Sequence, residues 1–260
     1  MLGGAPANVA YHLLHCGVSS RLISRVGNDP RGLAARARLQ ELGLDASGVQ
    51  EDASLPTGAA QAVVDAQGQA HYTFTTPAAW DAIDTAGEPA PEVLVYGSLA
   101  QRDPRSANAI RALAARARRT VFDVNLRAPY IDRDAIEQSL RLAQMLKLNE
   151  DEAATLSDWF SLPTELRGLA AELTKSNPDR IVAITRGAAG ACLWANGQWL
   201  EAPAPAVRVV DTVGAGDAFL ASLVASWLGD RPWQEALTTA NYRAAQVAAS
   251  RGAMPGFRCA

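Results

Sequence analysis

The chain has 260 residues, enough for one large α/β domain or two small ones and for a core that needs no disulfide or metal. Hydrophobic residues make up 48%, charged residues 20% and aromatic residues 6%, a balance that excludes disordered and fibrous proteins. Lys and Arg total 24 against 27 Asp and Glu, so a formal net charge of -3 provides no strong basic field for nucleic acid or an anionic membrane.

Cysteine usage and the N-terminal segment indicate where the protein works. Cys16, Cys192 and Cys259 lie far apart, and no two of them have the spacing of a zinc or redox pair. The N-terminus shows no basic segment before an apolar run, and no stretch approaches the length of a membrane helix. We therefore expect reduced thiols, a cytoplasmic location and no membrane insertion.

Short β-rich runs alternate with longer helical runs along most of the chain. In chain order, the patterns predict a helix over 7–15, a strand over 21–26, a helix over 30–42, a strand over 92–97, a helix over 105–118, a strand over 120–124, a helix over 133–143, a strand over 145–148, a helix over 163–175, a strand over 180–185 and helices over 216–228 and 233–250. This alternation favours a mostly parallel sheet with helices on both faces. The proline-containing region 77–91 is interpreted as a surface loop, so residues 1–260 are expected to form one domain.

Two predicted hairpins interrupt the alternation. Runs 58–64 and 69–75, joined through Asp65-Ala66-Gln67-Gly68, cannot belong to a parallel crossover, and we expect them to form a small antiparallel flap. Its exposed surface would also suit a homodimer, although the oligomeric state stays open. The second hairpin, 191–194 and 198–201, turns through Asn196-Gly197, a pair suited to positive φ, and is expected at a sheet edge.

The strongest local signal is VVDTVGAGDAF at 209–219, where a β-branched run ends in a glycine-rich turn and an apolar helix begins. The small residues Gly214, Ala215 and Gly216 allow backbone N–H groups to converge on an anion. The helix dipole adds positive potential at the same point. The segment therefore predicts a phosphate site.

Asp217 lies in the first turn of that helix. Acidic residues favour helix starts for reasons of capping and helix dipole alone. A carboxylate beside a phosphate site is nevertheless electrostatically unfavourable unless it has a task, such as accepting a proton from an attacking hydroxyl. We favour this functional interpretation of Asp217.

Two common nucleotide motifs are missing from the sequence. No Walker A pattern, G-x-x-x-x-G-K-[ST], occurs in it. The only G-x-G, at 214–216, is followed by Phe219 where the dinucleotide fingerprint requires a third small residue. A P-loop site is therefore unsupported, and a dinucleotide dehydrogenase is disfavoured.

Taken together, several motifs resemble those of the ribokinase-like (PfkB-type) carbohydrate kinases. GGAPANVA at 3–10, with GNDPRG at 27–32, resembles the N-terminal signature of that family, and DTVGAGD at 211–217 resembles its C-terminal signature. Between them lie segments similar to the family's D-x-N-x-R, N-x-x-E and T-x-G-x-x-G motifs, at 123–127, 149–152 and 185–190. The resemblance covers essentially the whole chain and implies a three-layer αβα fold with a small antiparallel lid.

The resemblance also implies a reaction, the transfer of the γ-phosphoryl group of ATP to a hydroxyl of a small sugar. Asp217 would be the general base, and the amides of Gly214, Ala215 and Gly216 would form the anion hole. Asn149 and Glu152 would organise Mg²⁺ and phosphate, with Glu152 reaching the metal through water. These roles suit phosphoryl transfer, which depends mainly on positioning and charge stabilisation.

Further positions follow from the same resemblance. Gly3, Gly4 and Asn8 would contact the sugar, and Arg127 would contact a phosphate. Thr185, Gly187 and Gly190 would lie along the nucleotide, with Asn241 near the adenine. A monovalent cation such as K⁺ would be bound by Asp211 and the carbonyls of 250–255. Simpler interpretations stay open: turn chemistry for Gly3, Gly4 and Asn8, a salt bridge for Arg127 and a solvated amide for Asn241.

The N-terminus departs from the family pattern. The resemblance implies a first strand with an acidic residue that binds sugar hydroxyls, well ahead of Gly3 and Gly4, and this chain lacks both. We expect Met1 to be an internal or mis-assigned start, and the sheet to lack its first strand. His12 and His15 lie three residues apart on one predicted helix, but no partner ligand stands at metal spacing, so we assign them no metal.

The sequence bears on three classes of function. GSLA at 97–100 and AWD at 79–81 look most like fructokinase-type members, with ribokinase and 2-keto-3-deoxygluconate kinase open and a nucleoside kinase less favoured. The alternative is an N-terminally truncated or non-catalytic member that binds nucleotide or sugar, although a pure binder has no need of Asp217. A DNA-binding regulator is disfavoured because the chain has neither a helix-turn-helix extension nor a basic field.

Overall fold

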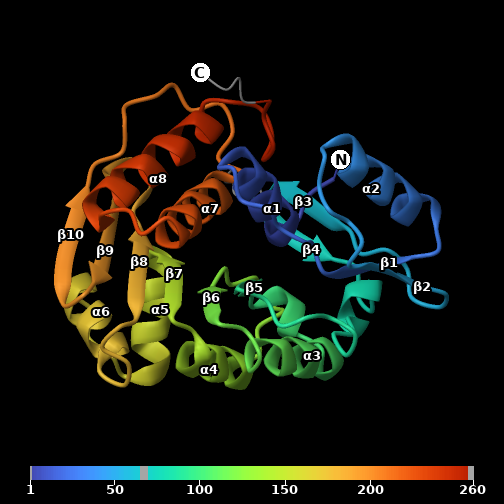
Figure 1. Cartoon of the computed structure of the whole chain (residues 1–260), viewed down its shortest axis with the longest axis horizontal. Helices are drawn as coiled ribbons and strands as arrows, with labels where there is room; N and C mark the ends of the chain where they lie inside the picture. Colours follow the sequence, from blue (N-terminus) through green and yellow to red (C-terminus); the bar gives the residue numbers. More distant parts are fainter. Residues whose placement is uncertain (1, 65–69, 257–260) are drawn as a thin grey trace.

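The computed structural model describes residues 2–64 and 70–256 (Figure 1). At its centre is a six-stranded sheet in the order β10-β9-β8-β7-β6-β5. The parallel strands are β5 (Val93–Gly97), β6 (Arg119–Asp123), β7 (Met145–Asn149) and β8 (Ile181–Thr185), and the antiparallel ones are β9 (Ala191–Ala195) and β10 (Gln198–Ala202). The predicted mostly parallel sheet is confirmed.

Helices cover both faces of this sheet, as Figure 1 shows. One layer holds α1 (Ala5–His15), α7 (Ala215–Leu228) and α8 (Trp233–Ala248), and the other holds α3 (Pro104–Ala114), α4 (Arg133–Leu142), α5 (Glu150–Phe160) and α6 (Leu166–Thr174). In the described ranges, no helix is both long and apolar enough to cross a bilayer. The three-layer arrangement predicted from the sequence is confirmed.

Strand alternation separates the two halves of the core. Side chains of a β-strand point alternately to opposite faces. On β6, Val121 packs in the cluster that includes Phe219 and Leu220 of α7, whereas Phe122 packs in the cluster that includes Ile136 of α4. The neighbouring strand β7 alternates in the same way, and this alternation decides which of its residues can reach α7.

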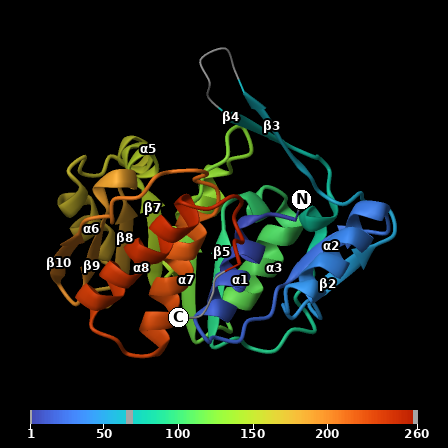
Figure 2. The same cartoon turned by 90° about the horizontal axis from the view of Figure 1, so that it is seen from above.

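Two smaller sheets lie outside the central one. β1 (Ser24–Gly27) pairs in parallel with β2 (Val49–Asp52), next to α2 (Pro30–Glu41), and β3 (Ala60–Val64) pairs antiparallel with β4 (Ala70–Phe74). The β3–β4 hairpin projects from the body of the protein (Figure 2). It is the predicted flap, called the lid below, and its expected turn at 65–68 lies outside the described residues.

The second predicted hairpin is confirmed at the edge of the central sheet. β9 and β10 are joined through Asn196 and Gly197, which have φ angles of 51° and 73°. At the opposite edge of the central sheet, β5 has a strand partner on one side only among the described residues, and the same holds for β1 in its own two-stranded sheet. Residues 2–4 form no strand ahead of α1.

Several predicted boundaries are wrong, each for a local reason. The helix predicted over 105–118 ends at Ala114, because the amides of Arg118 and Arg119 already bond to Pro91 and Glu92 and bring the chain into the sheet. The helix predicted from 163 begins at Leu166, with Glu165 as its N-cap. Region 77–91 is only partly a surface loop, since it contains a 3₁₀ turn, Ala79–Ala82, and Ala78 and Ala79 are fully buried.

Candidate active site

Four elements meet at one place on the α7 side of the sheet. The side chain of Asn8 on α1 donates a hydrogen bond to Asp217 Oδ2 on α7 over 2.7 Å. On the adjacent strands, Lys147 of β7 and Asp123 of β6 form an ion pair of 2.9 Å. Lys147 also lies beneath the start of α7, because a Cβ atom added to Gly216 would lie 3.1 Å from Lys147 Nζ. These contacts bring three sequence-predicted residues together with two that were not predicted individually.

The carboxyl group of Asp217 is buried, and 9% of the residue is exposed. Burial and the neighbouring carboxylate of Asp123 raise its pKa from the ordinary 3.8 to about 6, against the opposing influence of the Asn8 hydrogen bond and of the positive charges of Lys147 and Arg127. A carboxyl with a pKa near 6 is mostly ionised at neutral pH, yet still basic enough to take a proton in a reaction. The structure therefore fits Asp217 for general-base chemistry.

Lys147 is the main component that the sequence interpretation missed. Its side chain is 8% exposed and that of its partner Asp123 is 5% exposed. Burial by itself lowers the pKa of Lys147, but the carboxylates of Asp123, Glu152 and Asp217 together raise it above its ordinary value, so the ammonium group stays charged. A lysine within the apolar strand MLKLN was a usable signal, because a buried charge requires a partner.

The glycine-rich turn begins α7 with its amides pointing out of the helix. Gly214 is the N-cap and has a left-handed backbone, with φ 83° and ψ -6°. A Cβ atom there would lie 2.5 Å from the Cβ of Ala253, so glycine is required both for conformation and for space. The amide of Ala215 bonds to Thr212 O at 3.2 Å, and those of Gly216 and Asp217 precede the first helical bond, from Ala218 to Gly214.

Asn149 and Glu152 form a reciprocal cap at the start of α5. The Asn149 side chain accepts a hydrogen bond from the amide of Glu152 over 2.8 Å, and Glu152 Oε2 accepts one from the amide of Asn149 over 2.9 Å. Glu152 Oε1 accepts a third bond, from the amide of Leu126 over 3.0 Å. Burial raises the pKa of Glu152, a shift that the charge of Lys147 opposes. The N-x-x-E motif thus ties β7 and α5 to the chain that follows β6.

Comparison with known proteins identifies the family of the chain. The profile of the pfkB family carbohydrate kinases matches residues 1–258. The chain belongs to the pfkB family of carbohydrate kinases.

Individual relatives of this kinase show how far the similarity extends in sequence and in structure. It is 33% identical over 236 residues to a fructokinase of Klebsiella pneumoniae, an alignment covering 86% of this chain and 76% of the relative. The fructokinase of Vibrio cholerae O395, solved with fructose, ADP and calcium, aligns with a TM-score of 0.84 at 26% identity, covering 97% of this chain and 86% of that one. Aminoimidazole riboside kinase from Salmonella enterica, solved with aminoimidazole riboside and an ATP analogue, gives 0.82 at 28%, covering 97% and 87%.

Three of the residues predicted to line the sugar, Gly3, Gly4 and Asn8, lie at the N-terminal end of α1. Gly4 is the N-cap of α1 with φ 108°, and a Cβ atom added to Gly3 or Gly4 would meet nothing within 4 Å. The half-buried side chain of Arg127 bonds to the carbonyl of its neighbour Leu126 over 2.9 Å and contributes positive charge toward Asp217. Open space therefore lies in front of the glycine pair, while Asn8 is already bonded to Asp217.

Two of the residues predicted to line the nucleotide, Gly190 and Asn241, meet at Ala202, the last residue of β10. Thr185 ends β8, and Gly187 begins the short 3₁₀ turn that leads to Gly190. A Cβ atom at Gly190 would lie 2.1 Å from the carbonyl oxygen of Ala202. Asn241 donates to the same oxygen over 2.8 Å and is 4% exposed, so the simpler interpretation of Asn241 as a solvated amide is wrong. Contact of these residues with nucleotide stays a prediction.

Gly190 provides a direct test of the packing against Ala202. We expect Gly190→Ala to lower the free energy of unfolding by about 2 kcal/mol or more, because the new Cβ both clashes with Ala202 and strains a backbone with φ 93°. Gly197→Ala is the matched control: φ there is 73°, but nothing lies within 4 Å, so only the backbone strain applies. Urea unfolding of both variants measures the difference, and equal losses would contradict the packing argument.

Asp211 joins the glycine-rich turn to the C-terminal segment. One of its oxygens accepts from the amide of Val213 and the other from that of Gly252, both over 3.0 Å. In that segment the Ala253 carbonyl contacts His12 Nε2 at 2.9 Å, and Tyr11 OH donates to the Pro255 carbonyl over 2.7 Å. A cation at Asp211 stays a prediction. Burial lowers the pKa of His12 to about 4, which agrees with a packed, neutral imidazole.

Proposed function

We propose that this kinase transfers the γ-phosphoryl group of ATP to a hydroxyl of a small sugar, fructose in the first instance. The observation that carries the proposal is the position of Asp217: a buried carboxyl at the amide-rich start of α7, bonded to Asn8 on α1. Fructose is supported by the fructokinase of Klebsiella pneumoniae and by the fructose-bound fructokinase of Vibrio cholerae. ATP is supported by the ATP analogue bound to the Salmonella enterica enzyme.

In this mechanism the acceptor hydroxyl lies within reach of Asp217. The carboxylate takes the hydroxyl proton as the oxygen attacks the γ-phosphorus, and ADP leaves from the opposite side. Negative charge that develops on the transferred group is stabilised by the amides of Gly214 and Gly216 and by the positive end of α7, whereas the amide of Ala215 is already bonded to Thr212 O. Lys147, fixed beneath Gly216, adds a positive charge that needs no rearrangement during the reaction.

The residues present also fit a Mg²⁺ ion that takes only some of its oxygen ligands from the protein. Mg²⁺ prefers oxygen ligands and is usually held by one or two carboxylates together with substrate phosphates and water. In the described ranges, no group of three or more His, Cys, Asp or Glu residues converges on one point. Asp123 Oδ2 is buried without a hydrogen-bond partner, and both oxygens of Glu152 hold backbone amides. Glu152 would reach the ion through water, and the bound ion would neutralise charge on the ATP phosphates.

An acceptor panel tests the proposal. ADP formation from ATP and Mg²⁺ is measured with fructose, ribose, 2-keto-3-deoxygluconate and aminoimidazole riboside, each with and without the acceptor. We expect ADP formation that depends on one of these acceptors, with fructose giving the highest kcat/KM. ATP binding measured by calorimetry, together with no acceptor-dependent ADP across the panel, would overturn the proposed function.

A further inference from the structure

The two ends of the lid hairpin join it to the body of the protein (Figure 2). At this base, the amide of Thr75 bonds to Ala59 O over 2.9 Å and the amide of Ala59 to Thr75 Oγ1 over 3.1 Å. Three side chains from outside the hairpin contact these ends, and a fourth, Asp81, pairs with one of them. The four are Trp80, Asp81, Arg102 and Tyr130, and are called the lid-base cluster.

Trp80 packs directly against the first lid segment. A Cβ atom at Gly58 would lie 2.2 to 2.5 Å from three carbon atoms of the Trp80 ring, so the ring rests on the glycine backbone. The same ring meets Phe74, in the second lid strand, edge-on at 6.4 Å between centroids. A single side chain therefore contacts both sides of the hairpin base.

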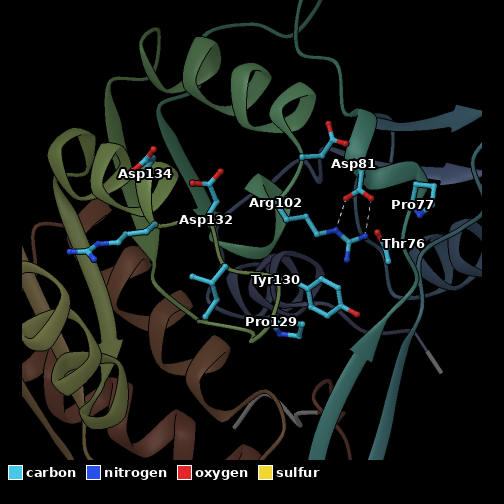
Figure 3. Close-up of a pocket in the computed structure, with 11 residues that line it drawn as sticks. Thr76, Pro77, Asp81, Arg102, Pro129, Tyr130, Asp132 and Asp134 are labelled. Atoms are coloured by element: carbon cyan, nitrogen blue, oxygen red, sulfur yellow. Dashed lines mark hydrogen bonds and ion pairs between the residues drawn. The ribbon is translucent and has the colours of Figure 1, made fainter.

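Arg102 holds the second lid segment through a buried charge. Its Nη2 donates to Thr75 O over 2.6 Å, while Nε and Nη2 form a two-point ion pair with Asp81 at 2.7 and 2.8 Å (Figure 3). The guanidinium also stacks over Trp80 and Tyr130, 5.3 and 5.2 Å from the ring centroids. With 7% of the Arg102 side chain exposed and 3% of that of Asp81, little solvent weakens this pair.

Tyr130 connects the lid to the proposed site. Its hydroxyl lies 3.3 Å from the Phe74 amide, which donates to it, and 3.2 Å from the Phe74 carbonyl, which accepts from it. Its own amide donates to the carbonyl of Arg127 over 2.8 Å. A cavity of about 550 Å³ lies beside these groups, lined by residues that include Thr76, Arg102, Tyr130 and Asp134, so the cluster has free space on one side (Figure 3).

We infer that the lid-base cluster sets the angle of the lid and thereby positions the acceptor sugar, with Arg102 and Tyr130 as positioning residues. The inference rests on the proposed function for its substrate. Each anchor follows a strand whose carboxyl end lies at the site, since Arg102 comes after β5 and Tyr130 after β6. The segment after β6 therefore carries both Tyr130 and Arg127, whose charge acts on Asp217, whereas Gly190 and Asn241 meet on other segments.

Two conservative variants test the inference. Arg102→Lys keeps the charge but loses the two-point ion pair with Asp81 and the stacking of the guanidinium on the aromatic rings. Tyr130→Phe loses only the hydroxyl that bonds to Phe74. We expect KM for the acceptor that wild type uses best to rise about fivefold to tenfold, with less than about a threefold change in kcat and in KM for ATP. Arg118→Lys is the control, because Arg118 forms an exposed pair with Glu92.

Hydrogen exchange without any substrate provides an independent measurement. In both variants we expect exchange of the peptides that contain Ala59 and Thr75 to accelerate by about tenfold, while peptides of β7 and β8 stay unchanged. Unchanged exchange at the lid base overturns the inference, and so does faster exchange with an unaltered acceptor KM or an equal rise in both KM values. If wild type phosphorylates no acceptor, the proposed function fails, and the exchange result still decides whether the cluster fixes the lid.

Discussion

Asp217→Asn is expected to abolish acceptor-dependent ADP formation while making the protein more stable. Loss of the base lowers kcat by about 10³-fold, the usual contribution of general-base catalysis. The pKa of Asp217 is raised from 3.8 to about 6, so the fold disfavours the ionised form. Above pH 6 the carboxyl is ionised in both the folded and unfolded states, so the folded state is destabilised by the full free energy of burying the charge. Asn carries no charge and removes this destabilisation.

The free energy of unfolding at pH 7 should therefore rise by about 1 to 3 kcal/mol in Asp217→Asn. The stability gain should shrink as the pH falls below 6, because folded wild type then holds a neutral carboxyl and the cost disappears. Urea unfolding at pH 5 and pH 8, together with calorimetry of ATP binding, measures both effects. A variant that loses stability together with activity would indicate a structural role for Asp217 instead.

Lys147→Met is expected to produce the second large effect. Removing the cation leaves the buried carboxylate of Asp217 without the positive charge of Lys147, which lowers its pKa, so Asp217 binds a proton at higher pH. The acidic limb of the kcat/KM profile should move upward by about one pH unit, which by itself lowers activity at pH 7 by about twofold. Loss of the positive charge beneath Gly216 should lower activity by about a further fivefold or more at every pH. Activity should recover in part as the pH is raised toward 9.

Matched substitutions separate this charge effect from a loss of folding. Breaking a buried ion pair costs about 3 to 5 kcal/mol, so circular dichroism must first confirm that Lys147→Met is folded. Lys147→Arg keeps the charge and should keep the limb near its wild-type position. Lys175→Met removes the only other lysine of the chain, which forms an exposed pair with Glu172, and should leave the profile unchanged. An unshifted limb in folded Lys147→Met would refute the proposed coupling.

The parts of the fold that follow from local pattern were predictable from the sequence. Apolar strands such as 181–185, fully covered on both faces, read as continuous hydrophobic runs, and Asn196-Gly197 specifies its own turn. β2 escaped prediction because VQED buries only its first and last residues, and half of it is charged. α5 was not predicted because its first residues, NEDE, were interpreted only as a ligand-binding motif, although the same four residues form its capping box.

The candidate site was predictable where a motif is contiguous and not where the fold assembles it. Gly214 to Asp217 form one segment, so their placement at a helix start followed from the sequence. Asp123 and Lys147 are separated by 24 residues and meet only through the parallel register of β6 and β7, in which they are direct partners. The lid-base cluster is drawn from three separate segments with no shared periodicity, so only the tertiary structure reveals it.

The most direct test of Asp217 as the base is the pH dependence of wild-type kcat/KM for the acceptor. A general base must be ionised to act, and the pKa of Asp217 is about 6. Between about pH 5 and 9, the account predicts an acidic limb with a midpoint near pH 6 that is lost with the activity in Asp217→Asn. A profile that stays flat through pH 5, or residual Asp217→Asn activity with the same limb, would contradict it.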